Sequence, residues 1–85
     1  MPEISRFLGI VIGMFYSEHG PSHLHAVYGE FKMTVELESR RVRGQFPARA
    51  ERLVLEWMQL HHQELVDNWN RARQRQPLER IAPLE

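Results

Sequence analysis

Residues 23–38 read HLHAVYGEFKMTVELE, and this stretch decides the fold. Apolar side chains stand at every second position before and after Gly29-Glu30. Such alternation predicts two strands that each bury one face, and glycine at the first position of a two-residue loop favours a type II′ turn. The sequence therefore predicts a β-hairpin in which Tyr28 lies opposite Phe31.

Counting outward from this turn fixes the register of the hairpin, because side chains alternate between the two faces of a strand. A second two-residue turn at Ser39-Arg40 predicts a further strand that places Arg43 beside Glu36. Three cross-strand pairs of the hairpin share its polar face: Val27 with Lys32, His25 with Thr34, and His23 with Glu36. The polar face is thus expected to gather two histidines, a carboxylate and an arginine.

The segments on either side of the hairpin predict one strand before it and a helix after it. Residues 7–16 alternate large apolar side chains and predict a single strand. Neither proline nor glycine interrupts residues 48–73, where core-facing residues recur every three or four positions: Ala50, Leu53, Val54, Trp57, His61, Leu65, Trp69 and Ala72. This spacing predicts one long amphipathic helix, with a break near His61-His62 as the alternative.

The fold class that follows is α+β. A three- to four-stranded antiparallel meander sheet over about residues 5–44 is expected to pack on the C-terminal amphipathic helix, over about residues 47–74. An extended tail over residues 76–85 follows the helix. A chain of 85 residues is near the lower limit for one hydrophobic core, so a single domain over residues 1–85 is expected.

Composition narrows the class of protein. Eleven basic and eleven acidic side chains cancel, so no overall field attracts nucleic acid or an anionic membrane. Cysteine is absent, which excludes disulfides and thiolate metal sites. Glu3 stands where a signal peptide carries positive charge, and the apolar run over residues 7–16 is about half a membrane span. We therefore expect a cytoplasmic protein that does not enter a membrane.

The histidines of the hairpin are candidate metal ligands. Because His23 and His25 are two residues apart on one strand, their Cα atoms lie roughly 6.6 Å apart on one face, a separation that a metal ion can bridge. Glu36 would add a carboxylate, and His19 in the preceding loop a third nitrogen. The structural alternative is an ion pair between Glu36 and Arg43. A divalent metal ion is the only cofactor that this pattern suggests.

The same face also suggests cleavage of RNA. Imidazole titrates near neutral pH, so His23 and His25 are candidate acid and base, with Arg43 stabilising charge on the phosphate. The arginines at positions 71, 73 and 75 offer further phosphate contacts, or they complement the helix dipole. The sequence contains no phosphate loop, serine-nucleophile elbow or metalloprotease motif. Enzymatic activity therefore stays open, and a non-enzymatic role fits the sequence better.

The C-terminal tail carries a third candidate function. Two prolines, at positions 77 and 83, prevent a continued helix, whereas Leu78, Ile81 and Leu84 remain apolar. Such a tail either docks on its own domain or binds a partner protein. These three side chains are the candidate partner-binding residues.

Several segments together resemble a bacterial family, the domain-of-unknown-function family 4160. They are Pro2–Phe7 with Gly9–Ile12, His19–Ala26, Leu53–Trp57, and Pro77-Leu78 with Ile81. Residues 21–26 read Pro-Ser-His-Leu-His-Ala where the family usually has Pro-Pro-His-Phe-His-Ala, so both histidines are kept. The family's signature positions fall here on His19, His23, His25, Ala26, Glu56 and Trp57.

The resemblance implies a biological setting but no established activity. Genes of the family resemble toxin–antitoxin modules in their arrangement, and they often stand beside the gene of another small protein. We therefore expect a component of a toxin–antitoxin-like module that acts by association with the small protein encoded by a neighbouring gene. The alternatives are a histidine-dependent ribonuclease-like toxin that binds RNA and a small metal-binding module. The small core also suggests a homodimer.

Overall fold

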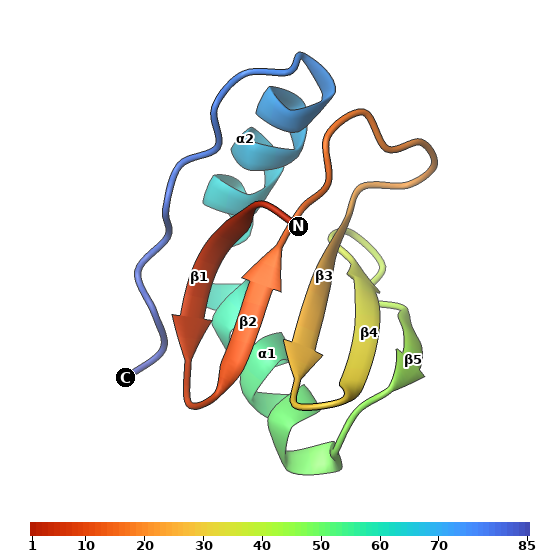
Figure 1. Ribbon diagram of the computed structural model, residues 1–85, viewed down its shortest axis with the longest axis vertical. Coiled ribbons are helices and arrows are strands. Elements are labelled where there is room, and N and C mark those ends of the chain that lie inside the picture. Colours follow the sequence, from red (N-terminus) through yellow and green to blue (C-terminus); the bar gives the residue numbers. More distant parts are fainter.

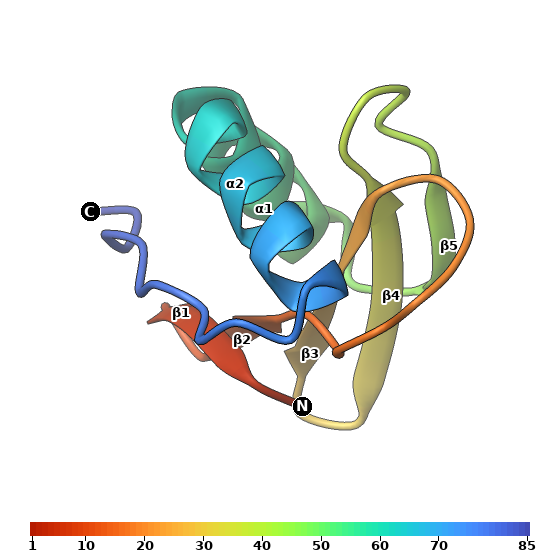
Figure 2. The ribbon, with the colours of Figure 1, turned by 90° about the horizontal axis from the view of Figure 1, so that it is seen from above.

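The computed structural model describes residues 1–85 as a five-stranded antiparallel sheet with two helices packed against one face (Figure 1). The strands follow one another in space as they do in the sequence, which confirms an α+β meander. The elements are β1 (Glu3–Phe7), β2 (Ile10–Gly13), β3 (His23–Tyr28), β4 (Phe31–Glu36), β5 (Val42–Gln45), α1 (Ala48–Leu60) and α2 (His62–Arg73). Figure 2 shows that the sheet is curved and that both helices lie on its concave side.

The sheet has five strands, so the prediction of three or four is wrong. Residues 7–16 do not form one strand, because a tight turn at Leu8-Gly9 separates β1 from β2 and pairs Phe7 with Ile10. Both turn residues have positive φ, 51° for Leu8 and 82° for Gly9, as a type I′ turn requires. Leucine rarely adopts this conformation, and the alternation of apolar residues continues through the turn. The residue types and their alternation therefore did not predict this turn.

The hairpin of β3 and β4 has the predicted register, with Tyr28 opposite Phe31 and His25 opposite Thr34. The predicted pairing of Glu36 with Arg43 is wrong, because β5 is shifted by two residues and Arg43 lies opposite Thr34. The connecting loop spans residues 37–41 rather than Ser39-Arg40 alone. Its Leu37 is fully buried and donates its N–H to the carbonyl of Ser22 (2.9 Å), so it is not available for pairing with β5.

The C-terminal helix is two short helices, so the prediction of one long helix is wrong and the alternative of a break near His61-His62 is confirmed. His61 has a φ of −123°, outside the helical range, and separates α1 from α2. A straight helix of 26 residues would be about 39 Å long, whereas the longest dimension of the molecule is 33 Å. The break lets both segments stay on the sheet. Neither helix has the length and apolar character needed to cross a bilayer.

The core lies between the sheet and the helices. Its fully buried side chains come from all of the elements except β5: Ile4, Ile10, Ile12, Leu24, Ala26, Val35, Val54, Trp57, Met58 and Leu65, with Met14 and Leu37 from the loops. The inward residues of β3 and β4 are therefore those that the alternation predicted. The opposite face of these strands carries the polar residues, and Trp69 of α2 contacts it at the start of β3, through the ring of His23.

The tail after α2 is docked on its own domain and runs beside β1 (Figure 1). The Ile81 N–H donates to the Ile4 carbonyl (2.8 Å), and the indole N–H of Trp57 donates to the Ala82 carbonyl (2.8 Å). Ile81 is buried, and the candidate partner-binding residues Leu78 and Leu84 pack partly buried against the core. A partner that bound these side chains would have to displace the tail. Partner binding through them stays a prediction.

Candidate functional site

The open face of the sheet carries one row of residues that crosses four strands. Gly13 pairs with His25, His25 with Thr34, and Thr34 with Arg43. Neighbouring strands are about 4.8 Å apart, so the backbones of His25 and Arg43 are separated by roughly 10 Å. Because β5 is shifted from its predicted register, Arg43 belongs to the row of His25 rather than to that of His23.

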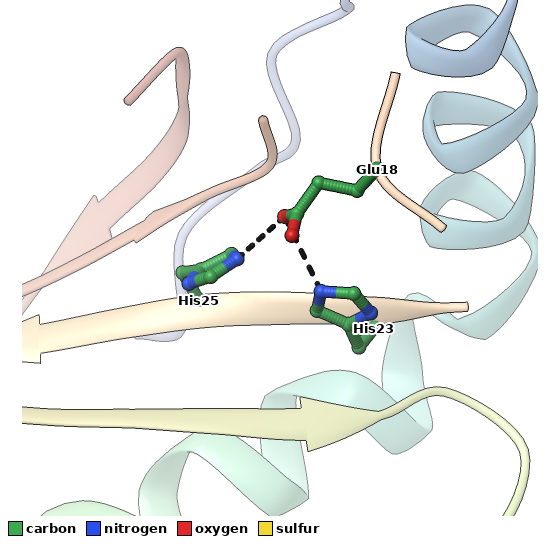
Figure 3. Close-up of side chains that lie close together, drawn as sticks. All are labelled: Glu18, His23 and His25. Carbon is green, nitrogen blue, oxygen red and sulfur yellow. Dashed lines mark hydrogen bonds and ion pairs between the residues drawn. The ribbon is translucent and has the colours of Figure 1, made fainter. Parts of the chain in front are cut away.

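A carboxylate from the loop between β2 and β3 joins both histidines. The Oε1 atom of Glu18 lies 2.7 Å from Nε2 of His25 and 3.2 Å from Nε2 of His23 (Figure 3). All three side chains are partly buried, with 29%, 23% and 16% of the side chain exposed for Glu18, His25 and His23. One ligand atom from each lies within 4.8 Å of the other two. These three residues are called the Glu18 cluster below.

The loop that carries Glu18 is held in place by the C-terminal end of α2. The Ser17 N–H donates to the Ala72 carbonyl (3.3 Å), and the Ser17 hydroxyl accepts a hydrogen bond from Arg75 Nε (3.1 Å). Ser17 and Gly20 have positive φ, 59° and 88°, which turns the chain back toward β3. The loop thereby projects the Glu18 side chain over the two histidines of β3 (Figure 3).

His23 is oriented by contacts on both sides of its ring. Its Nδ1 lies 2.8 Å from the Pro21 carbonyl, which only accepts, so Nδ1 carries the hydrogen. Its ring also packs against Trp69, with 5.0 Å between ring centroids. In a neutral His23 the lone pair of Nε2 would then face the Glu18 carboxylate. Two acceptors 3.2 Å apart repel each other unless a cation joins them, either a proton on Nε2 or a metal ion.

His25 has a different environment. Its ring meets the edge of Phe15 at 90°, with centroids 4.7 Å apart, and its Nε2 is held by Glu18. Its Nδ1 makes no hydrogen bond within the chain. His25 therefore presents one nitrogen to the carboxylate and keeps the other available.

The charge of Glu18 is set by competing effects. Burial raises the pKa of the Glu18 carboxyl, but the hydrogen bond from His25 and the charges of His25 and His23 outweigh burial and hold the pKa below its usual value. Glu18 is therefore ionised at neutral pH. It offers a full negative charge to whatever cation joins the two imidazoles.

Two adjoining hollows extend from the Glu18 cluster along the open face. The larger, of about 540 Å³, is lined by His25, Lys32, Thr34 and Arg43 and by the apolar side chains of Met1, Phe15 and Val27, among others. The smaller, of about 230 Å³, shares Thr34 and Arg43 with it and adds His19, Pro21, His23 and Glu36. The two hollows together are called the open-face groove below.

The structure brings together most, but not all, of the residues that the sequence pattern selected. His23, His25 and Arg43 line one continuous groove. Glu36 lines the smaller hollow with His23 but is not part of the Glu18 cluster, and its Oε1 accepts a hydrogen bond from Ser39 (2.7 Å). His19 is exposed, lines the smaller hollow and contributes no ligand atom to the Glu18 cluster.

Glu18 was missed by the sequence analysis and takes the position expected for Glu36. The only signal available was a spacing, a carboxylate five residues before the first of two histidines that share a strand face. That spacing lies across a turn containing Gly20-Pro21, and the path of such a turn depends on contacts with α2. Alternation along a strand gives no information about it.

Comparison with known proteins gives one match. The model of the family described as "Domain of unknown function (DUF4160)" matches residues 9–70, which include the Glu18 cluster and α1. The curated proteins and the solved structures give no match to this chain. The link to toxin–antitoxin modules and to a neighbouring gene's product stays a prediction.

Proposed function

The chain belongs to the DUF4160 family, and we propose that it binds a divalent transition metal ion, foremost zinc, through Glu18, His23 and His25. One observation carries the proposal. The Pro21 carbonyl fixes the hydrogen of His23 on Nδ1, so Nε2 is directed at an ionised carboxylate as a metal ligand would be. Metal-binding histidines commonly donate their second N–H to a backbone carbonyl or carboxylate in this manner.

The two distances between the Glu18 carboxylate and the imidazoles are close to those of a tetrahedral site, and the three ligand atoms all lie within 4.8 Å of one another. Zinc bonds of about 2.0–2.1 Å to nitrogen and oxygen give about 3.3 Å between neighbouring ligand atoms. The Glu18 oxygen is 2.7 Å from one Nε2 and 3.2 Å from the other. Side-chain movements of a few tenths of an ångström would open these contacts to the required separation. The Glu18 side chain is 29% exposed, so part of it faces solvent rather than packed neighbours.

The ligand set also indicates what the ion would do. Two imidazoles and one carboxylate are the ligands of several catalytic zinc sites, which leave a fourth position for water or substrate. His25 and His23 line the open-face groove, so this position would be reached from the groove. The chemistry supported is that of a Lewis acid.

Zinc titration of the purified, chelator-treated protein tests the proposal. Zinc at about one hundred times its dissociation constant stabilises the folded state by about 2.7 kcal/mol, which raises the melting temperature by roughly 10–20 °C for a domain of this size. His25→Gln and Glu18→Gln should abolish the rise, whereas His19→Gln is the matched control in the same loop and should keep it. An unchanged melting temperature for the wild type, with no heat of binding, would refute a metal site.

A second candidate use of the same residues is RNA cleavage without a metal. It is favoured by the free Nδ1 of His25, because an imidazole held by a carboxylate through its other nitrogen can act as a general base. Arg43, in the same groove, would stabilise charge on the phosphate. Cleavage of single-stranded RNA that persists in excess chelator and disappears in His25→Gln would support this candidate. Cleavage that requires added zinc would exclude it.

A further inference from the structure

The larger hollow of the open-face groove has a composition that the Glu18 cluster does not explain. Lys32 and Arg43 line it from neighbouring strands, and neither forms an ion pair within the chain. No carboxylate lines this hollow. The two cations therefore face a cavity without any internal anion to balance them.

The register places these two cations at a useful separation. Thr34 lies opposite Arg43, and Lys32 is two residues before Thr34 on the same face of β4. Diagonal neighbours of this kind have side-chain origins roughly 7–8 Å apart. The flexible ends of lysine and arginine can converge from that distance on one phosphate group, with the Thr34 hydroxyl between them.

The wall beside His25 is apolar and partly aromatic. Phe15 is 41% exposed and contacts the His25 ring, and Met1 lies over Gly13, where an added Cβ would come within 2.5 Å of the Met1 side chain. Val27 continues the apolar surface toward Lys32. An exposed aromatic ring near clustered cations is the usual means of holding an unpaired base by stacking.

We propose that the open-face groove binds a nucleotide, with its phosphate on Arg43 and Lys32 and its base against Phe15. A volume of about 540 Å³ is sufficient for such a ligand. The proposal deepens the proposed function, since it names the class of ligand that would reach the open position of the metal. The two cations and Phe15 are not metal ligands, so nucleotide binding is measured separately from zinc binding.

The test uses the full chain in excess chelator at low ionic strength, with adenosine 5′-monophosphate, adenosine and an eight-residue single-stranded oligoadenylate as probes. Binding is followed by calorimetry and by NMR shifts of the groove residues. Adenosine 5′-monophosphate should bind at least about tenfold more tightly than adenosine, because the charged contacts require the phosphate. Arg43→Gln and Lys32→Gln should each weaken its binding by about tenfold or more.

Two matched controls separate the groove from general charge and hydrophobicity. Arg41→Gln removes the same charge from an exposed position outside the groove, and Tyr16→Leu removes an equally exposed ring next to Phe15 in the sequence. Both should leave binding unchanged, whereas Phe15→Leu should weaken it. Equal losses in Arg41→Gln and Arg43→Gln would overturn the proposal, as would the absence of binding by both phosphate-bearing probes.

The remaining outcomes identify the source of the nucleotide and keep the two proposals distinct. Tighter binding of the oligomer than of the mononucleotide would support a single strand as the ligand, and equal affinity would support a free nucleotide. Nucleotide binding in a protein that does not bind zinc would refute the metal site alone. Zinc binding in a protein that ignores both phosphate-bearing probes would refute the nucleotide site alone.

Discussion

Replacing Asn68 by alanine should release the C-terminal tail. Asn68 is 1% exposed and makes both hydrogen bonds of its amide with one backbone unit of the tail. Its Nδ2 donates to the Glu79 carbonyl (2.8 Å), and its Oδ1 accepts from the Glu79 N–H (2.9 Å). The alanine variant keeps the helix but leaves the N–H and the carbonyl of Glu79 without these partners.

The expected loss follows from these two bonds. Each hydrogen bond contributes about 0.5–1.5 kcal/mol, so the loss of both should lower the free energy of unfolding by about 1–3 kcal/mol. For a domain of this size such a loss lowers the melting temperature by roughly 5–20 °C. The loss is limited by detachment of the tail, which would expose Ile81 and break its bond to Ile4.

Urea unfolding and hydrogen exchange measure the two parts of this effect. Asn68→Ala should lower the free energy of unfolding and remove the exchange protection of the Ile81 N–H. Asn70→Ala is the matched control, because Asn70 is an exposed asparagine on the same helix and should change stability by less than about 0.5 kcal/mol. A loss below that value in Asn68→Ala, with Ile81 still protected, would show that these bonds do not hold the tail.

Two further predictions concern the N-terminal strands. Leu8→Asn should raise the free energy of unfolding by about 0.5–1 kcal/mol, because Leu8 is exposed with a φ of 51° and Asn-Gly is the preferred type I′ pair. Urea unfolding measures this change, and a decrease in the free energy of unfolding would argue against the turn. The hydrogen bond from Arg6, with a further one from Arg80, outweighs burial and lowers the pKa of Glu3. The ionised Glu3 therefore stabilises the folded state above the pKa of the unfolded chain, and this stabilisation is lost as the pH falls through the folded pKa. Between neutral pH and about pH 3, Glu3→Gln should lose less stability than the wild type. Parallel stability curves would exclude this role of Glu3.

The parts of the fold that the sequence predicted are those set by local pattern. The register of β3 and β4 follows from alternation around Gly29-Glu30, and these two signals agree. The turn at Leu8-Gly9 was missed because its first residue adopts a conformation that its side chain disfavours. The shift of β5 depends on the Leu37 N–H, which donates to the Ser22 carbonyl, and this tertiary contact has no signature along the chain.

In the candidate site, too, the residues placed by a local pattern were predicted and the residue placed by tertiary contacts was not. That His23 and His25 share a face is a consequence of their spacing, and the structure places them so. Glu18 comes from a loop whose path is set by Ser17 contacts with Ala72 and Arg75, more than fifty residues later in the chain. Sequence spacing therefore identified the histidines but selected the wrong carboxylate.

The anchoring of the Glu18 loop on α2 also orders events during folding. A hairpin closes quickly because its contacts are local, so both histidines can reach one strand face early. We expect Glu18 to reach them only when the end of α2 has formed and docked, because Ser17 bonds to Ala72 and Arg75 and the His23 ring packs on Trp69. The complete cluster is thus a product of the finished fold and cannot nucleate it. In this respect the chain is the opposite of a zinc finger, in which the ion assembles the domain around itself.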